Sequence, residues 1–296
     1  MDIYLYERKK VLLIIIKMDL KNKKVSNYYN KEGWEKGISS RLLDDEINRN
    51  HSLVSAEYFS KIEKKILNEL NSLEISKLKL LDVGCGAIQI PERQEQSRNF
   101  KERHCVDFSK KALQIASKNL LNSGQSNNFF YNIEFLDNKF ESSMFDATVC
   151  MHVLYHVDIS LQEKFVRELI RVTKKNGYIF IAYSNPYGLI NILRLPFRIF
   201  ELIKEFIKSI LTWITGFNDK NLYFRRKNIF WWRKFKDKCD IKISSLNTFN
   251  SKFLNFIIPN SNLGKNALNL LFKLESFKFW RFFSEYYIVV LKVKDN

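Results

Sequence analysis

Short apolar runs alternate with amphipathic stretches through the middle of the chain. Residues 53–75 carry apolar side chains at spacings of three and four, which predicts an amphipathic helix. Short, nearly continuous apolar runs predict buried strands. They cover residues 78–84, 104–108, 130–136, 145–151 and 178–184. Strands that alternate with helices in this order predict an α/β fold, with a mostly parallel sheet and helices on both faces.

Several polar residues mark the ends of the predicted helices. Ser109 is placed to cap a helix that Gly124 ends. The predicted inward face of this helix consists of Ala112, Leu113, Ala116 and Leu120. Ser160 and Glu163 have the spacing of a capping box, and the helix that they open is predicted to run to Lys175. Pro91 fits the first turn of a further helix.

The pattern changes after Asn185. Residues 196–214 predict one helix with only a narrow polar stripe. Such a helix is buried on most sides, meets a partner, or lies in a membrane interface. Two strand-like runs follow at residues 240–246 and 286–293.

The positive charge is concentrated in the last third of the chain. The net charge is +17, of which residues 186–296 contribute +12 from 20 basic and 8 acidic residues. Basic and aromatic side chains interleave at residues 223–234 and again at 272–283. A basic surface of this kind faces nucleic acid, an acidic substrate or anionic lipid.

Several classes of protein are disfavoured by the same sequence. The four cysteines are far apart and form no metal-binding motif, which fits a reducing cytoplasm. No apolar stretch has the length of a membrane span. The apolar run at residues 11–16 is too short for a signal peptide, and Met18 reads as an alternative start, so residues 1–17 are either native or a mis-called extension.

A glycine turn follows the first predicted strand, in the segment Leu80–Gly86. Glycines at the end of a strand let the backbone approach a ligand closely and adopt positive φ angles. Asp107 ends the second predicted strand, 21 residues beyond Gly86. A carboxylate there can accept both hydroxyls of a nucleotide ribose, although such an acid taken alone is more often a solvated strand end.

Two further segments fall at the same edge of the predicted sheet. Asp137 and Asn138 close the third strand, where an acid or amide can meet an adenine, although alone they indicate a turn. Residues 145–152 form a strand that ends in His152. Ligands of open α/β sheets bind at the carboxyl ends of the strands, so these segments converge on one expected site.

These motifs resemble those of the class I S-adenosylmethionine (SAM)-dependent methyltransferases. The matching segments, in order and spacing, are residues 80–86, 106–109, 145–157 and 167–178. The resemblance implies a Rossmann-like, seven-stranded sheet with a reversed final hairpin. It divides the chain into an N-terminal extension (1–24), a SAM-binding core (25–185), and a basic, aromatic helical cap that includes the last two strands (186–296).

The resemblance also implies roles for individual residues. Asp82, Gly84 and Gly86 are expected around the methionine part of SAM, Asp107 at the ribose, Asp137 and Asn138 beside the adenine, and His152 near the methyl group. Cys85, Phe108 and Met151 belong to the same motifs and are further candidates for cofactor contact. Aromatic residues before the first helix are expected to form a lid or a packing patch: Tyr28, Tyr29 and Trp34.

The sequence departs from the family pattern in two places. The third glycine that is common in the loop is Ile88 here, which puts the shape of the loop in doubt. No Asn-Pro-Pro-Tyr tetrapeptide follows the fourth strand, which argues against the subfamily that methylates amino groups of adenine or glutamine.

The function expected from these features is methyl transfer to a small-molecule, glycan or lipid-linked acceptor. His152 and His156 are the candidate general bases, with a structural role equally open. Residues 194–234 are expected either to touch an anionic membrane surface or to belong to an ordinary cap buried on the catalytic domain. The predicted location is the cytoplasm, at the inner face of the membrane in the first case. The alternatives are an RNA methyltransferase that uses the basic last third, and a non-catalytic SAM-binding or scaffold protein.

Overall fold

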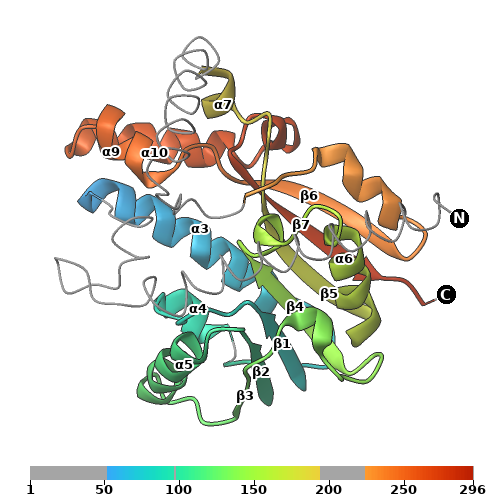
Figure 1. Ribbon diagram of the computed structural model, residues 1–296. Coiled ribbons are helices and arrows are strands. Elements are labelled where there is room, and N and C mark those ends of the chain that lie inside the picture. The colour runs from blue at the N-terminus through green and yellow to red at the C-terminus, as the bar shows by residue number, and fades with distance from the viewer. Residues whose placement is uncertain (1–51, 97, 194–223, 296) are drawn as a thin grey trace, which may run out of the picture.

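The computed structural model describes residues 52–96, 98–193 and 224–295, which form a seven-stranded sheet (Figure 1). The strand order is β3-β2-β1-β4-β5-β7-β6. The strands are β1 (Lys79–Val83), β2 (Glu102–Val106), β3 (Asn128–Tyr131), β4 (Phe145–Met151), β5 (Thr173–Ser184), β6 (Cys239–Asn247) and β7 (Tyr286–Val293). Strands β1 to β5 pair in parallel, and β7 is antiparallel to both its neighbours. The predicted fold class and the reversed final hairpin are confirmed.

Helices cover both faces of the sheet (Figure 1). On one face, α3 (Leu53–Asn71), α9 (Ser251–Ile257) and α10 (Asn262–Leu274) pack their apolar side chains against β1, β4, β5 and β7. On the other face, α6 (Gln162–Val172) and the 3-10 helix η4 (Ile229–Phe235) do the same. The shorter or peripheral helices are α4 (Pro91–Glu95), α5 (Lys110–Asn122), α7 (Leu189–Leu193), η1 (Phe135–Asp137), η2 (Leu154–His156) and η5 (Lys278–Phe282).

The cap predicted for α5 is confirmed, and the capping box predicted for α6 is wrong. The Ser109 hydroxyl accepts a hydrogen bond from the Ala112 amide at 3.2 Å. At α6, the carboxylate of Asp158 accepts from both the amide and the hydroxyl of Ser160, at 3.0 and 2.7 Å. Glu163 instead forms ion pairs with basic side chains, so it is not available to the Ser160 backbone. Asp158 thus takes the role that the capping box assigned to Glu163, because it accepts from the Ser160 amide.

Several predicted boundaries shift in the structure. The helix predicted at 53–75 ends at Asn71, and the strand predicted at 178–184 begins at Thr173. Helix α6 ends at Val172 rather than Lys175, because Thr173 already pairs with Phe145 of β4. Strand β2 begins and ends two residues earlier than predicted. Strand β3 ends at Tyr131 because the side-chain amide of Asn132 turns back to donate to the backbone oxygens of residues 107 and 108. The apolar residues that follow belong to η1, which packs its Phe135 in the core.

The last third of the chain completes the sheet as well as extending it. Trp232 and Phe235 are fully buried against the β5–β7 side of the core, and the Trp232 indole donates to the Tyr287 hydroxyl at 3.0 Å. The expectation of exposed aromatic residues at 223–234 is therefore wrong for Trp232, which is a core residue. The boundary predicted near residue 185 stays a prediction.

Several predictions fall outside the described residues: the extension 1–24, the lid residues Tyr28, Tyr29 and Trp34, and the helix 196–214. Within the described ranges, no helix combines the length and the apolar character needed to cross a bilayer.

A buried ion pair joins β1 to β2. The Arg103 guanidinium contacts the Asp82 carboxylate at 2.5 Å, and the two side chains are 1% and 8% exposed. Arg103 also donates to the backbone oxygen of Arg93 at the end of α4, at 2.8 Å. This one side chain therefore connects two strands and a helix at the edge where the glycine turn begins.

We predict that Arg103→Met destabilises the protein by about 3–5 kcal/mol, because it leaves the Asp82 carboxylate buried without its counter-charge. The measurement is urea unfolding at neutral pH. Arg98→Met is the matched control, because Arg98 forms an exposed ion pair with Glu95 whose loss should cost less than about 1 kcal/mol. Equal losses of stability in the two variants would contradict the role assigned to Arg103.

Candidate functional site

The turn after β1 has a backbone that glycine supports. Gly84 and Gly86 have φ angles of 64° and 58°. A Cβ atom on Gly84 would lie 2.3 Å from the Val153 side chain, which follows β4. The amides of Gly84 and Cys85 both donate to the Val106 oxygen at the end of β2, at 2.7 and 3.2 Å. The carboxyl ends of β1, β2 and β4 are thus held together without side-chain bulk between them.

Asp107 lies against this turn. One carboxylate oxygen accepts from the Gly86 amide at 3.0 Å, and the other accepts from the Ser109 amide at 2.8 Å. Burial raises the pKa of Asp107 to about 6, with the two amide hydrogen bonds acting in the opposite direction. An ionised carboxylate accepts about four hydrogen bonds, so acceptor positions remain for two ligand hydroxyls.

Ile88 adopts the conformation that a glycine would have at this point of the loop. Its φ angle is 46°, which is unusual for a β-branched residue, and its side chain is only 3% exposed. The side chain packs with Leu113 and Leu120 of α5 and with Cys105 of β2. The core therefore holds in place a backbone conformation that is strained for isoleucine. After this residue, Pro91 begins α4 as predicted.

The acidic residues near the expected adenine position differ in how they are engaged. Asn138 donates to the Phe135 oxygen and to Glu168, and its own oxygen accepts from the Phe140 amide. The side chain of Asn138 is therefore committed to its turn and to α6. Asp137 is exposed. The pKa of its neighbour Glu134 is raised mainly by burial and further by the negative charge of Asp137. The expected contact of Asp137 and Asn138 with adenine stays a prediction.

Three other cofactor candidates are buried at the ends of the first strands. Asp82 forms an ion pair with Arg103. If Asp82 also contacts the methionine part of SAM, as expected, Arg103 and SAM would have to share its carboxylate. Burial raises the pKa of the Cys85 thiol well above its usual value, and Met151 is 6% exposed at the end of β4. Phe108 is half-buried directly after Asp107.

His152 occupies a strained position immediately after β4. Its φ angle is 65°, and its amide donates to the Ala182 oxygen of β5 at 3.3 Å. Its Nδ1 lies 3.2 Å from the Tyr155 hydroxyl, and its ring centre is 5.1 Å from that of Tyr286. A non-glycine residue with this backbone next to a ligand site is a recurrent feature of functional positions.

The side chains of Tyr155 and Tyr286 lie beside His152. The two tyrosine ring centres are 6.0 Å apart, and burial raises the pKa of Tyr286 to about 12. His156, the other candidate base, packs its ring 4.6 Å from Tyr155 and 5.7 Å from Phe224. His152 therefore contacts both tyrosines, through its Nδ1 and through its ring.

Arg226 was not identified from the sequence, and its guanidinium lies near Tyr286 at the rim of the expected acceptor site. Arg226 lies 5.1 Å over the Phe224 ring and donates to the Asn185 oxygen at 3.2 Å. Burial lowers its pKa, and the nearby Tyr286 and Glu285 act in the opposite direction. No carboxylate within the described ranges forms an ion pair with it. The only signal in the sequence was its place in a basic and aromatic run.

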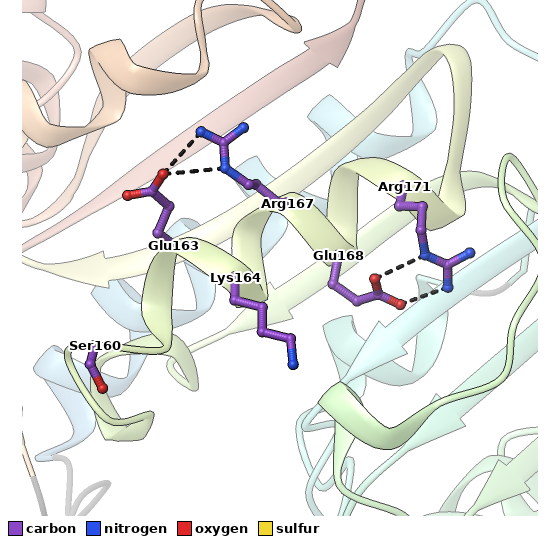
Figure 2. A pocket seen from close by; sticks show the side chains of 6 residues that line it. All are labelled: Ser160, Glu163, Lys164, Arg167, Glu168 and Arg171. Carbon is purple, nitrogen blue, oxygen red and sulfur yellow. Dashed lines mark hydrogen bonds and ion pairs between the residues drawn. The ribbon is translucent and has the colours of Figure 1, made fainter. Parts of the chain in front are cut away.

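A pocket elsewhere is unrelated to this site (Figure 2). It lies along α6 and the turn before it, and its lining residues are Ser160, Glu163, Lys164, Arg167, Glu168 and Arg171. Figure 2 shows two ion pairs along this helix, Arg167 with Glu163 and Arg171 with Glu168. Their charges compensate each other, and none of the predicted site residues lines the pocket.

Comparisons with known proteins agree with this geometry. Residues 81–181 match the family model described as a methyltransferase domain. The ubiquinone biosynthesis O-methyltransferases of Rickettsia prowazekii and Rickettsia typhi are each 32% identical, over 54% and 58% of this chain. The chain spans 55% and 62% of the length of these relatives. The N-methyltransferase NodS from Bradyrhizobium japonicum, solved with S-adenosylhomocysteine (SAH), shares the fold with a TM-score of 0.53 at 9% identity, covering 92% of this chain and all of that one.

We predict that SAH binds about tenfold more weakly at pH 5 than at pH 7. Below a pKa of about 6, Asp107 becomes protonated and loses the charge that ribose hydroxyls favour, so affinity falls as the pH falls. Calorimetric titration measures this effect. Asp107→Asn should bind weakly at both values, whereas Asp240→Asn, an exposed control on β6, should behave like the unmodified protein. Full pH dependence in Asp107→Asn would contradict the assignment.

The family model and the structural comparison cover different parts of the chain. The family model covers the segment from β1 to β5, which contains the glycine turn, Asp107 and His152. The structural comparison covers 92% of this chain. Residues 81–181 therefore match a methyltransferase domain, and the chain shares the fold of a solved methyltransferase.

Proposed function

We propose that this protein transfers the methyl group of SAM to an acceptor that binds beside His152. The carrying observation is the series of contacts His152–Tyr155–Tyr286 at the end of β4, in which the His152 Nδ1 lies 3.2 Å from the Tyr155 hydroxyl and the Tyr286 ring lies beside both. Val153, the residue after His152, contacts the position above Gly84, so this series lies next to the turn expected to hold SAM. The acceptor and the cofactor would then meet at the junction of β1 and β4.

SAM supplies a methyl group already activated by its sulfonium, so the protein has to position the acceptor and exclude water. A base is required only when the acceptor must lose a proton, as a hydroxyl must. If His152 carries its proton on Nδ1 and donates it to the Tyr155 oxygen, Nε2 is the ring nitrogen that can accept a proton from the acceptor.

The chemistry at the rim favours an acceptor that also carries an anionic group. Arg226 offers a half-buried guanidinium that forms no ion pair with the described residues and lies near Tyr286, with Glu285 close enough to act on its pKa. Guanidinium groups recognise carboxylates and phosphates through paired hydrogen bonds. The names of the Rickettsia relatives refer to O-methyl transfer, which supports a hydroxyl as the accepting group. We therefore favour a hydroxyl acceptor with an acidic substituent, within the small-molecule, glycan or lipid-linked class.

The two alternative functions keep less support. The basic last third favours RNA methylation, for which tRNA binding should weaken steeply as salt is raised. A non-catalytic role rested on Ile88, but Ile88 has the left-handed backbone that the loop requires. Residence in the cytoplasm stays a prediction.

We predict that His152→Asn lowers methyl transfer by about 10²–10⁴-fold, the range for loss of a general base, while SAH affinity is unchanged. Asparagine tolerates positive φ, so this variant removes the imidazole without adding backbone strain. The assay follows tritium from labelled SAM into an extract of small polar and lipid metabolites. His156→Asn is the matched control and should retain most activity, because the contact of His156 with Tyr155 is ring packing. Equal losses in both variants would remove His152 from the role of base.

Absence of any transfer would leave SAH titration to decide the function. SAH binding without methyl transfer to any extract would support the non-catalytic alternative, and absence of SAH binding by the folded protein would refute the proposal itself.

A further inference from the structure

An aromatic surface is exposed directly before β7. Four phenylalanines in and beside η5 are 39–54% exposed. They are Phe277, Phe279, Phe282 and Phe283, and together with Lys278 and Arg281 we call them the η5 surface. Soluble proteins seldom expose so many large apolar side chains together, and such patches mark sites of interaction with proteins, ligands or membranes.

The backbone that carries the η5 surface is firmly anchored. The Trp280 indole donates to the Thr248 hydroxyl at 2.8 Å, and the Leu189 amide donates to the Phe283 oxygen at 2.7 Å. Arg281 donates to the Ile243 oxygen at 3.2 Å. Trp280 and the buried Ser284 therefore point inward, which directs the phenylalanines to solvent. Their exposure is a property of an ordered element.

Cations accompany these rings. Arg281 lies 5.1 Å over Phe282, and Phe282 lies 6.4 Å from the exposed Phe230. Arg233 lies 4.9 Å over Phe230, so the aromatic surface continues onto η4 with a second cation. The nearest acids in the sequence do not offset this charge at the surface, because Glu275 is 3% exposed and Glu285 is half-buried.

We propose that the η5 surface, with Phe230 and Arg233, docks on an anionic lipid bilayer. Aromatic rings insert at the boundary between head groups and acyl chains, while lysine and arginine pair with lipid phosphates. The charge favours this occupant over an apolar protein partner: residues 224–295 contain 15 Lys and Arg but only 5 Asp and Glu. This surface shares Phe230 and Arg233 with the expected contact at 194–234, of which residues 224–234 are described, and its main part lies at residues 277–283.

The docked surface lies close to the expected acceptor site. The side-chain amide of Asn185 donates to the backbone oxygens of Phe282 and Ser284, both at 3.0 Å. The backbone oxygen of the same Asn185 accepts from Arg226 at the rim. An amphiphilic acceptor could therefore place its polar end at Arg226 and Tyr286 while its apolar part stays in the bilayer. This consequence rests on the proposed function, but the docking itself does not.

The test is co-sedimentation of the full chain with vesicles of phosphatidylcholine, with and without phosphatidylglycerol. We expect binding to the anionic vesicles, weakened by salt, and a loss of about tenfold or more in the triple variant Phe277→Ser, Phe279→Ser, Phe282→Ser. Lys278→Glu with Arg233→Glu should remove the preference for anionic vesicles. Leu121→Ser is the matched control, because Leu121 is 67% exposed on α5, far from η5 in the fold (Figure 1).

Three outcomes would overturn the proposal: no binding to either kind of vesicle, equal binding by the triple variant, or equal loss in Leu121→Ser. A concentration-dependent dimer that the triple variant abolishes would assign the surface to a second copy of this chain instead. SAH titration of each variant separates this result from the proposed function, since docking variants should bind SAH normally and a misfolded variant should not.

Discussion

The contact between Arg103 and Asp82 is the constraint on which the cofactor edge of this protein depends. It links β1 to β2 two residues before Gly84. Through the backbone oxygen of Arg93 it also attaches α4. The glycine turn lies between these two attachments, and Asp107 closes it from β2. A charge pair is costly to bury, and here it remains buried because strands and helix converge on it from three directions.

The residues that were predictable from the sequence are those whose role is set by local order. The glycines, Asp107 and the all-buried β4 follow from a strand, a turn and a fixed spacing, and the structure places them at one edge. The relation of His152 to Tyr286 was not predictable, because 134 residues separate them and only the antiparallel β7 brings them together. Arg103 gave no signal either, since a single arginine in a short strand is usually interpreted as a solvated residue.

The failed capping box at α6 and the hydrogen bonds of Asn138 have a related cause. In both places a polar side chain had the correct spacing for one partner and found a better one nearby: Asp158 for Ser160, and Glu168 for Asn138. Short-range competition of this kind is invisible to a pattern of residue types, because several acceptors lie within reach of the same donor. The apolar pattern, by contrast, was nearly always correct, since burial is decided by the whole sheet.

Ile88 couples the cofactor loop to the core in a way that glycine would not. A glycine could hold the same turn by itself, whereas isoleucine holds it only while Leu113 and Leu120 receive its side chain. Residue 88 and the inner face of α5 should therefore change together during evolution. In a relative that carries glycine at this position, we expect larger residues on the facing side of α5, because they would fill the space that the Ile88 side chain occupies here.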